Sequence, residues 1–334
     1  MFGKMLKQVY GLKNGQEMRI EKYRAYLQGE SLYLIITAKG RKEQEISELE
    51  QIGSMLYTLG DKEVPVFVRP ENGPLLNKWE GEDYCLLRYP ELRANILDKV
   101  PTRLALLHNK GRRMPFRVEA VNRIGQWKSL WEKRLDQIEA VWNGKLMQEP
   151  ENDFERMFID SFPYYMSLAE NSIQYLTDTE IDVAASEADS GTVCHERFTS
   201  ATWKEYVIKN PFEWVFDHPS RDLAEWIRDR HFYNMQTSKP EISRFLAGYQ
   251  QKSMLSPFGW RLLYARLLFP LHYFECIEDY HMTGSEQQRR FLEDRLEKYL
   301  KQSAEHERFL GSFYEANQAP VKAFQLPAVN WLTK

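Results

Sequence analysis

The sequence predicts an α+β protein with a small N-terminal lobe of antiparallel strands around one helix and a larger, mostly helical C-terminal lobe. Three observations predict this class. An alternating, β-rich run fills residues 31–37, a helical period of apolar residues follows, and long helical periods with aromatic anchors dominate the chain after residue 89. We therefore expect two parts, residues 1–88 and residues 89–334.

The first part of the chain has the pattern strand, helix, strand, strand. The strand at residues 31–37 ends near Gly40. Apolar residues then recur every three or four positions and share one helical face, namely Ile46, Leu49, Ile52, Met55, Leu56 and Leu59. This helix is expected to stop at Gly60. Residues 64–68 and 84–87 are the further predicted strands, with a turn at residues 72–74 between them.

Two apolar stripes predict core helices in the second part. One stripe consists of Trp127, Trp131, Leu135, Ile138 and Trp142, and the other of Phe291, Leu292, Leu296, Tyr299 and Leu300. Core packing is the preferred interpretation of both. Residues 178–191 are acidic and rich in small side chains, which indicates a surface loop or a poorly paired hairpin.

The composition excludes several classes of protein. With 45 basic and 48 acidic residues the formal net charge is -3, so no overall field favours nucleic acid or an anionic membrane. The three cysteines lie far apart without ligand spacing, so neither a disulfide scaffold nor a zinc site is expected. The first residues lack the apolar core of a signal peptide, and no segment is long and apolar enough to insert into a membrane. We expect synthesis in the cytoplasm.

The sharpest signal is a pair of segments near the middle of the chain. The first reads VCHERF at residues 193–198, and the second reads FEWVFDHPSRDLAEW at residues 212–226. In small-molecule kinases the matching region reads HGDxxxxN, then an apolar strand ending in Asp, then DLA at the start of a helix. The order and the approximate spacing both fit.

On these residues the chain resembles the CotS-like spore coat kinases and, within them, the coat-associated YutH group, which has the same DHPSRDLAEWIR segment. The resemblance covers nearly the whole chain. It implies a protein-kinase-like fold of the aminoglycoside phosphotransferase type. It also implies synthesis in the mother cell, a place in the spore coat and other coat proteins as partners.

Carried onto this chain, the family motif is altered at its reactive positions. His195 matches the motif's His, but Glu196 replaces Gly, and Arg197 replaces the Asp that accepts the proton of the attacking hydroxyl. Arginine, with a pKa above roughly 12, cannot accept that proton. Thr202 stands where Asn should hold magnesium, and it is a poorer ligand for a hard cation. Asp217, in the place of the metal-binding Asp, is the one carboxylate that remains.

The nucleotide side of the motif is also incomplete. A glycine-rich hairpin should precede the strand at residues 31–37 and cover the phosphates, but Gly29 stands there alone. The lysine that grips phosphates in such folds corresponds to Lys39, with Glu45 or Glu48 as its partner on the helix. Solvated surface charge is the simpler interpretation of this pair. No cofactor is expected, and if Mg-ATP does bind, Lys39 and Glu48 are the candidate contacts.

Asp222 has a structural interpretation of its own. The order Ser-Arg-Asp-Leu-Ala-Glu favours Asp222 as the N-cap of a helix with Glu225 at N3, an arrangement that stabilises a helix by about 1 kcal/mol. In the resembled fold, this Asp also braces the loop that bears His195. A structural role is therefore preferred for Asp222, and a satisfied loop histidine is preferred for His195.

Other reactive combinations are absent from the sequence. It has no GxSxG, GxxxxGKS or HExxH motif, and its histidines are dispersed. A basic patch at residues 110–113 could contact phosphate, but a solvated turn is the simpler interpretation.

Three functional hypotheses follow. The first is a pseudokinase that acts as a structural or binding component of the spore coat. The second is an active ATP-dependent kinase for a small molecule or a protein, with Glu196 or Glu213 as an unorthodox base next to Asp217. The third is nucleotide binding without transfer. The sequence does not name a partner, a substrate or an oligomeric state.

Overall fold

The computed structural model describes residues 2–38, 40–70, 73–89, 94 and 96–332. Contacts between Cα atoms divide the chain into two compact units. The first consists of Met1–Arg123, Gly191–Asp222 and Gly248–Ser253, and the second of Ile124–Ser190, Leu223–Ala247 and Met254–Lys334. Each unit is described by itself. The lobe boundary expected between residues 88 and 89 stays a prediction.

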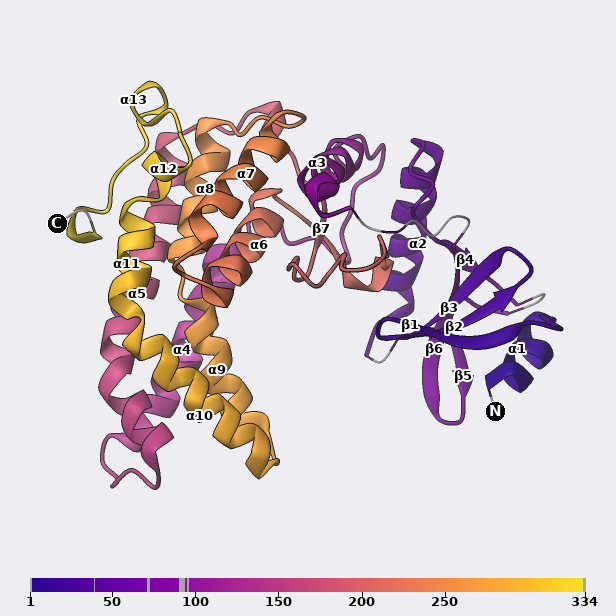
Figure 1. Ribbon diagram of the computed structural model, residues 1–334, viewed down its shortest axis with the longest axis horizontal. Coiled ribbons are helices and arrows are strands. Elements are labelled where there is room, and N and C mark those ends of the chain that lie inside the picture. The colour runs from indigo at the N-terminus through magenta and orange to yellow at the C-terminus, as the bar shows by residue number, and fades with distance from the viewer. Residues whose placement is uncertain (1, 39, 71–72, 90–93, 95, 333–334) are drawn as a thin grey trace. The chain divides into compact units, whose positions relative to one another are not determined.

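The first unit is built on an antiparallel sheet (Figure 1). Its strands are β1 (Gln16–Ile20), β2 (Tyr23–Gln28), β3 (Ser31–Thr37), β4 (Val66–Val68), β5 (Asn77–Trp79) and β6 (Glu82–Tyr89). The strand order is β1-β2-β3-β6-β4, and β5 pairs with β6. The strands expected at residues 31–37, 64–68 and 84–87 are confirmed as β3, β4 and β6. The expected turn at 72–74 lies partly outside the described residues.

β1 and β2 precede the first strand expected from the sequence. Tight two-residue turns join β1 to β2 and β2 to β3. Gly29 stands in the second turn with a φ of 59°, which a residue without a Cβ adopts at little cost. The lone glycine before residue 31 therefore shapes a hairpin within the sheet.

Helices pack on the sheet of the first unit. α1 (Phe2–Tyr10) places Met5 and Leu6 against Tyr26, Tyr84 and Leu86. α2 (Glu43–Thr58) buries Ile46, Leu49, Ile52 and Leu56 of the predicted apolar face, whereas Met55 and Leu59 are half-buried. On β3 the residues Leu32, Leu34 and Ile36 are buried, while Tyr33 and Ile35 pack against the α1 cluster. The two faces of the strand therefore both carry apolar contacts.

The remaining part of the first unit carries the predicted motif. α3 (Val100–Gly111) lies against β7 (Thr192–His195), which pairs with β8 (Trp214–Asp217) in antiparallel register. The hydroxyl of Thr192 donates a hydrogen bond of 2.7 Å to the His108 carbonyl, which fixes α3 to the strand. Short 3-10 helices occupy Leu97–Lys99 and Pro211–Glu213.

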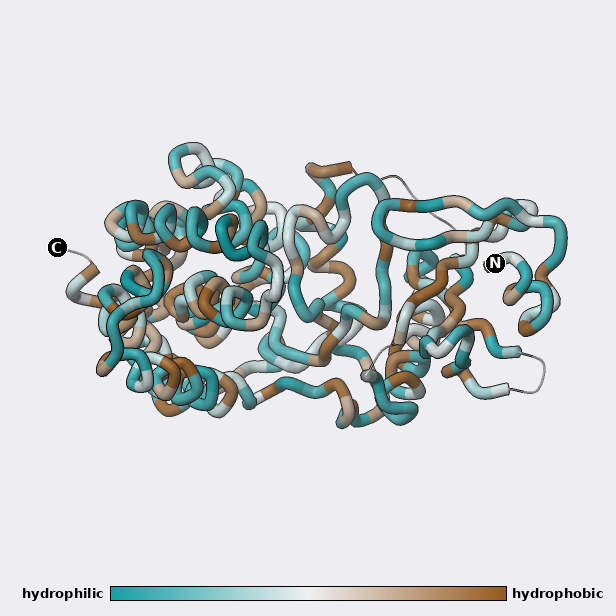
Figure 2. The backbone as a smooth tube through the Cα atoms, turned by 90° about the horizontal axis from the view of Figure 1, so that it is seen from below, coloured by the Kyte–Doolittle hydropathy of each residue, from teal (hydrophilic) through white to brown (hydrophobic). Residues whose placement is uncertain are grey.

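The second unit is helical throughout its described elements. It contains α4 (Trp127–Lys145), α5 (Asp153–Asp182), α8 (Pro257–Leu268), α9 (Leu271–Met282), α10 (Glu286–Lys301), α11 (Ser303–Gly311), α12 (Phe313–Ala316) and α13 (Val321–Phe324), with 3-10 helices at Glu187–Asp189 and Asn330–Leu332. α6 (Ser220–Tyr233) and α7 (Ser238–Gln250) each have residues in both units. Hydrophobic and hydrophilic residues alternate along these helices (Figure 2).

The structure corrects two expectations in this unit. α5 continues to Asp182, so residues 178–182 are not a loop. In the second stripe Leu292 and Leu296 are buried as predicted, but Phe291 is 57% exposed and lies under the Arg295 guanidinium. Adjacent residues of a helix point about 100° apart, so Phe291 and Leu292 cannot both face the core.

On α4 four residues of the expected stripe, Trp127, Trp131, Leu135 and Ile138, are buried as predicted, whereas Trp142 is half-buried. Among the helices that the structure describes, none is long and apolar enough to cross a membrane.

Candidate functional site

The predicted motif surrounds the small β7–β8 sheet of the first unit. β7 ends at His195, and the chain returns to β8 after residue 213. We call residues 196–202 the motif loop. The start of α6 then brings Asp222 back to His195, although the two residues lie 27 positions apart.

Asp222 is completely buried and holds the start of the motif loop. Its Oδ1 accepts the backbone N–H of His195 at 2.8 Å, and its Oδ2 lies 2.8 Å from His195 Nδ1 and 3.3 Å from His108 Nε2. Burial alone would raise the pKa of Asp222, but the interactions with the two histidines outweigh it, and the pKa lies well below its ordinary value. Asp222 is therefore an ionised structural anchor.

The expectation that Asp222 caps the helix is wrong. α6 begins at Ser220, so Asp222 is its third residue. The His218 ring performs part of the capping role, because its Nδ1 accepts the backbone N–H of Ser220 at 3.1 Å. The Asp222 carboxylate therefore binds the residue before the motif loop, His195, and does not cap the helix.

Asp217, the expected metal ligand, is 1% exposed and engaged on both oxygens. Oδ1 accepts the backbone N–H of His218 at 2.8 Å, and Oδ2 accepts a hydrogen bond of 2.8 Å from Arg221 Nη1. The same guanidinium donates to the carbonyl oxygens of His195 and Glu196, at 3.0 and 3.1 Å. Arg221 thus compensates the charge of Asp217 and ties it to the motif loop.

The two altered positions of the motif loop differ in their surroundings. Arg197, in the place of the proton acceptor, is exposed. The Thr202 hydroxyl accepts the backbone N–H of Thr199 at 2.9 Å and donates to the Arg197 carbonyl at 3.3 Å. Thr202 therefore closes the motif loop on itself, and its oxygen is already engaged.

Glu196, the first alternative base, is paired with Arg41, which lies just before α2. Its Oε1 accepts a hydrogen bond of 2.6 Å from Arg41 Nη2. Arg41 also donates to the Phe212 carbonyl at 2.8 Å and lies 3.4 Å from Glu45. Glu45 thus interacts with Arg41 at the start of α2.

Glu213, the second alternative base, contacts the turn between β1 and β2. Its Oε1 lies 2.6 Å from Lys22 Nζ and accepts a hydrogen bond of 2.7 Å from the Tyr23 hydroxyl. Burial raises the pKa of Glu213, but these two partners outweigh burial and the net pKa is lowered. Burial and Glu213 raise the pKa of Tyr23. A carboxylate with a lowered pKa is a weaker proton acceptor.

The expected nucleotide contacts are placed only in part. Lys39 lies outside the described residues. Glu48 accepts the backbone N–H groups of Glu119 and Val121, at 2.7 and 2.9 Å. Glu48 therefore connects α2 to the segment before residue 122 through backbone hydrogen bonds.

A cleft of about 510 Å³ opens between the β1–β2 turn and the motif loop. Its lining comprises Glu21, Lys22, Tyr23, Glu196, Arg197, Thr199, Ala201, Thr202, Lys204, Glu205 and Glu213. Glu21, which has a φ of 51°, accepts the backbone N–H groups of Glu205 and Tyr206 at 3.0 and 3.2 Å. The turn is thus fastened to the chain beyond the motif loop.

The two residues expected to hold magnesium, Asp217 and Thr202, already have partners within the protein. Magnesium needs oxygen ligands in a near-octahedral set, usually including a free carboxylate. Asp217 is committed to Arg221, and Thr202 closes the motif loop. We therefore derive no step through a bound nucleotide.

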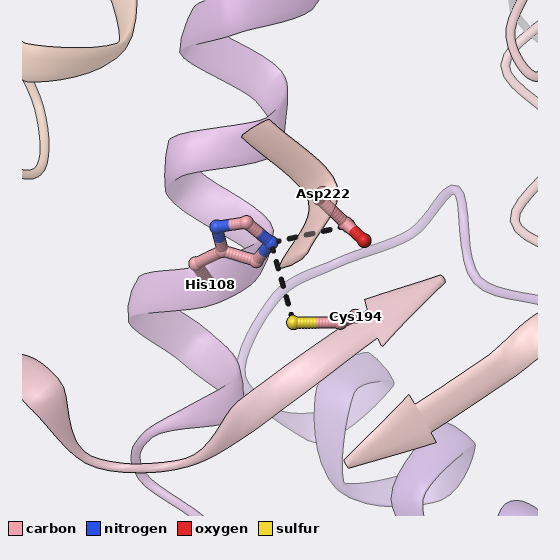
Figure 3. A group of neighbouring side chains, drawn as sticks. All are labelled: His108, Cys194 and Asp222. Atoms are coloured by element: carbon pink, nitrogen blue, oxygen red, sulfur yellow. Dashed lines mark hydrogen bonds and ion pairs between the residues drawn. The ribbon is translucent and has the colours of Figure 1, made fainter. Parts of the chain in front are cut away.

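One further group of potential ligands lies behind the motif loop. His108, Cys194 and Asp222 come from α3, β7 and α6, and their ligand atoms lie within 4.8 Å of one another (Figure 3). Burial lowers the pKa of His108 and raises that of the Cys194 thiol well above its ordinary value.

Three members of this site, His108, Arg41 and Arg221, could not be predicted from the sequence. His108 and Asp222 are 114 positions apart, and Arg41 and Glu196 are 155 apart. No local spacing connects such residues. Arg221 stands only four positions after Asp217, but the pair joins the end of β8 to the start of α6, so no helical spacing could have indicated it.

The fold and the motif together define the class of the protein. A crystal structure of an aminoglycoside phosphotransferase from Alicyclobacillus acidocaldarius matches with a TM-score of 0.65 and 13% identity, over 93% of this chain and 96% of that one. A spectinomycin phosphotransferase in complex with ADP and spectinomycin matches with a TM-score of 0.58 and 13% identity, over 88% and 92%. The chain therefore has the kinase-like fold of the aminoglycoside phosphotransferases, as predicted.

Sequence comparison identifies the family. The family model described as "Spore coat putative kinase YutH" matches residues 3–313. The endospore coat-associated protein YutH of Bacillus subtilis strain 168 is 40% identical over 331 residues, which is 98% of this chain and 97% of that protein. The chain belongs to the YutH spore coat family.

Proposed function

We propose that this protein is a binding or structural component of the spore coat whose kinase-like fold does not transfer phosphate. The observation that carries the proposal is the buried pair of Asp217 and Arg221, whose atoms Oδ2 and Nη1 lie 2.8 Å apart. Phosphoryl transfer requires metal ions that bridge the phosphates and a residue that orients the nucleophile. In this site the Arg221 guanidinium occupies one side of Asp217, the carboxylate that stands in the place of the metal ligand.

The position of the proton acceptor supports the same proposal. Arg197 stands where a carboxylate should be, and a guanidinium has no lone pair with which to accept the proton of a nucleophile. The two nearest alternatives, Glu196 and Glu213, each form an ion pair of 2.6 Å, with Arg41 and Lys22 respectively. Each of these two carboxylates is therefore already engaged with a cationic partner, and the lowered pKa of Glu213 makes it a weaker proton acceptor.

The coat assignment rests on the family and on the B. subtilis relative, which is named an endospore coat-associated protein. We propose that this chain is made in the mother cell and deposited on the forespore through contacts with other coat proteins. A fluorescent fusion followed through sporulation tests this. A fluorescent shell around the forespore is expected, and a signal that stays diffuse in the mother cell contradicts the proposal.

Purified protein tests the absence of phosphotransfer. Release of ADP from Mg-ATP is measured for the natural protein and for Asp217→Asn, which keeps the shape of the side chain and removes its charge. We expect the same background rate from both. Turnover that Asp217→Asn abolishes would overthrow the proposal and favour an active kinase with Glu196 or Glu213 as the base.

Thermal unfolding with and without Mg-ATP separates binding from transfer. A ligand at 100 times its dissociation constant stabilises the folded state by about 2.7 kcal/mol. We expect no shift of the unfolding temperature at millimolar Mg-ATP. A clear rise of the unfolding temperature without ADP release would contradict the expectation that Asp217 is unavailable to a metal ion. It would support nucleotide binding without transfer.

A further inference from the structure

Three potential metal ligands converge inside the first unit, apart from the cleft. His108, Cys194 and Asp222 have no solvent exposure. His108 Nε2 lies 3.3 Å from Asp222 Oδ2 and 4.0 Å from Cys194 Sγ (Figure 3). Because the three side chains come from different elements, the tertiary fold alone brings them together.

The two separations from His108 Nε2 approach those of ligands on one tetrahedral ion, and all three ligand atoms lie within 4.8 Å of one another. Zinc binds thiolate sulfur at about 2.3 Å and imidazole nitrogen or carboxylate oxygen at about 2.0–2.2 Å, so pairs of its ligand atoms lie about 3.3–3.7 Å apart. The separation of 3.3 Å between His108 and Asp222 already fits. The separation of 4.0 Å between Cys194 and His108 exceeds the range by a few tenths of an ångström, which a small side-chain adjustment would remove.

Outer partners orient two of the three ligands. The Tyr249 hydroxyl lies 2.8 Å from His108 Nδ1, which directs Nε2 toward Cys194 and Asp222. The backbone N–H of His195 holds Asp222 Oδ1 at 2.8 Å, and Oδ2, which also lies 2.8 Å from His195 Nδ1, faces His108. A hydrogen bond on the second ring nitrogen and a hydrogen-bonded carboxylate are the usual surroundings of metal ligands.

The charges also suit a divalent cation. A thiolate and a carboxylate carry two negative charges, and a neutral imidazole adds none, so a zinc ion makes the group neutral. The carbonyl oxygens of Asp217 and His218, 3.6 and 3.5 Å from Cys194 Sγ, offer a fourth ligand. Until an ion binds, the thiol donates its proton toward these carbonyls, and on binding that proton leaves to the solvent.

We propose that His108, Cys194 and Asp222 bind one Zn²⁺ ion that stabilises the first unit and holds the start of the motif loop. Soft thiolate and imidazole ligands select zinc over magnesium, so the ion is distinct from any that serves phosphates. The proposal is independent of whether the cleft transfers phosphate.

Cobalt substitution tests the site directly. The tag-free protein is freed of metal with a chelator and titrated with Co²⁺, whose visible bands report tetrahedral geometry and whose near-ultraviolet charge-transfer band reports a thiolate ligand. We expect one equivalent of Co²⁺ with both signals, displacement by Zn²⁺, and a higher unfolding temperature with either ion.

Matched cysteine variants locate the ligand. Cys194→Ser should lose the charge-transfer band, whereas Cys85→Ser and Cys276→Ser, which alter buried thiols on β6 and α9, should keep it. X-ray absorption at the zinc edge of the natural protein, with one sulfur among the ligands, gives the same answer if Cys194→Ser fails to fold. Absence of a cobalt signal and of any metal-dependent stabilisation, or a band retained in Cys194→Ser, overturns the proposal and leaves only a hydrogen-bond network.

Discussion

Asp217 keeps the carboxylate of the family motif, but Arg221 four residues later compensates its charge inside the protein. The pair is nearly inaccessible, with side-chain exposures of 1% for Asp217 and 15% for Arg221. The remaining donors of Arg221 reach the carbonyls of His195 and Glu196. A residue type typical of catalysis thus works here as a structural element of the loop.

This pairing predicts a large effect of removing the arginine. Arg221→Ala leaves Asp217 buried and unpaired, which should lower the free energy of unfolding by about 3–5 kcal/mol. The midpoint of urea unfolding measures the change. Arg290→Ala is the control, because its pair with Glu286 is 78% and 71% exposed and should contribute less than about 1 kcal/mol. Equal midpoint shifts in the two variants would show that the buried Asp217–Arg221 pair contributes no more to the free energy of unfolding than an exposed pair does.

The sequence predicts which residue type stands at each motif position, but it does not predict which other residues that side chain contacts. The alterations at Arg197 and Thr202 are visible in the sequence because the motif fixes their positions. The partners of Asp222 are not, because His108 lies 114 positions away and no pattern connects them. The predicted cap at Asp222 is wrong for a related reason. The helix begins two residues earlier, at Ser220, whose N–H donates to the ring of His218.

Among the elements, the contact of α3 with β7 decides how firmly the motif is held. Gly111 is the last residue of α3, and a Cβ there would lie 2.6 Å from the backbone nitrogen of Val193 and also collide with the Thr192 side chain. The helix can approach the strand this closely only with glycine at this position.

Gly111→Ala should therefore lower the free energy of unfolding by about 1–3 kcal/mol, because overpacking displaces the helix from the strand. Gly144→Ala in α4 is the matched control, since nothing lies within 4 Å of its Cβ position. Alanine in an open helical position should stabilise the protein by about 0.5–1 kcal/mol. Thermal unfolding of both variants checks the opposite signs, and a stabilised Gly111→Ala contradicts the close packing.

The turn between β1 and β2 is a second element with a specific anchor. Glu21 adopts a φ of 51°, a conformation that is strained for a residue with a side chain. Its carboxylate accepts the N–H groups of Glu205 and Tyr206. These two hydrogen bonds offset the strain and fasten the turn.

Glu21→Ala should free the amides of Glu205 and Tyr206, so their hydrogen exchange should become faster while exchange in the core of β3 stays unchanged. Glu30→Ala, in the exposed turn between β2 and β3, is the control and should alter neither amide. Unchanged protection at residues 205 and 206 in Glu21→Ala would show that the carboxylate does not hold them.

Helices and strands could be predicted where burial of one face gives the apolar residues a regular spacing. α2 and α4 follow from apolar residues spaced three or four apart, and β3 from its β-rich composition. β1 could not be predicted because four of its five residues are exposed, so no alternation of apolar and polar residues marks a buried face. The sequence of residues 178–182 indicates a loop because α5 ends in exposed acidic residues, whose polarity hides the helical period.

At the scale of the whole molecule, three buried histidines couple stability to pH. His231, His272 and His306 lie on α6, α9 and α11 of the second unit, and the ring of His306 is centred 5.1 Å from that of His231 and 5.2 Å from that of His272. Within the described part of the chain, both ring nitrogens of His231 and His306 lack a hydrogen-bond partner.

Their surroundings keep these rings neutral. Burial first, and then Lys239, lowers the pKa of His231 to about 3. Burial and the charges of Arg228 and the neighbouring rings lower the pKa values of His272 and His306 well below the ordinary value. Aromatic packing, such as His231 stacked 4.0 Å from Phe309, replaces the missing polar contacts.

Acid should therefore destabilise the protein before its carboxylates titrate. Below pH 6.5 the unfolded chain takes up protons that the folded rings cannot, so the free energy of unfolding falls by up to about 1.4 kcal/mol per pH unit for each such histidine. Urea midpoints measured from pH 7.5 down to pH 5 should fall steadily below about pH 6.5. His231→Phe removes one of the three groups and keeps the contact with Phe309, so its midpoint should fall less steeply over the same interval. A midpoint that does not change between pH 6.5 and pH 5 would mean that the rings reach water or a proton acceptor in the folded protein.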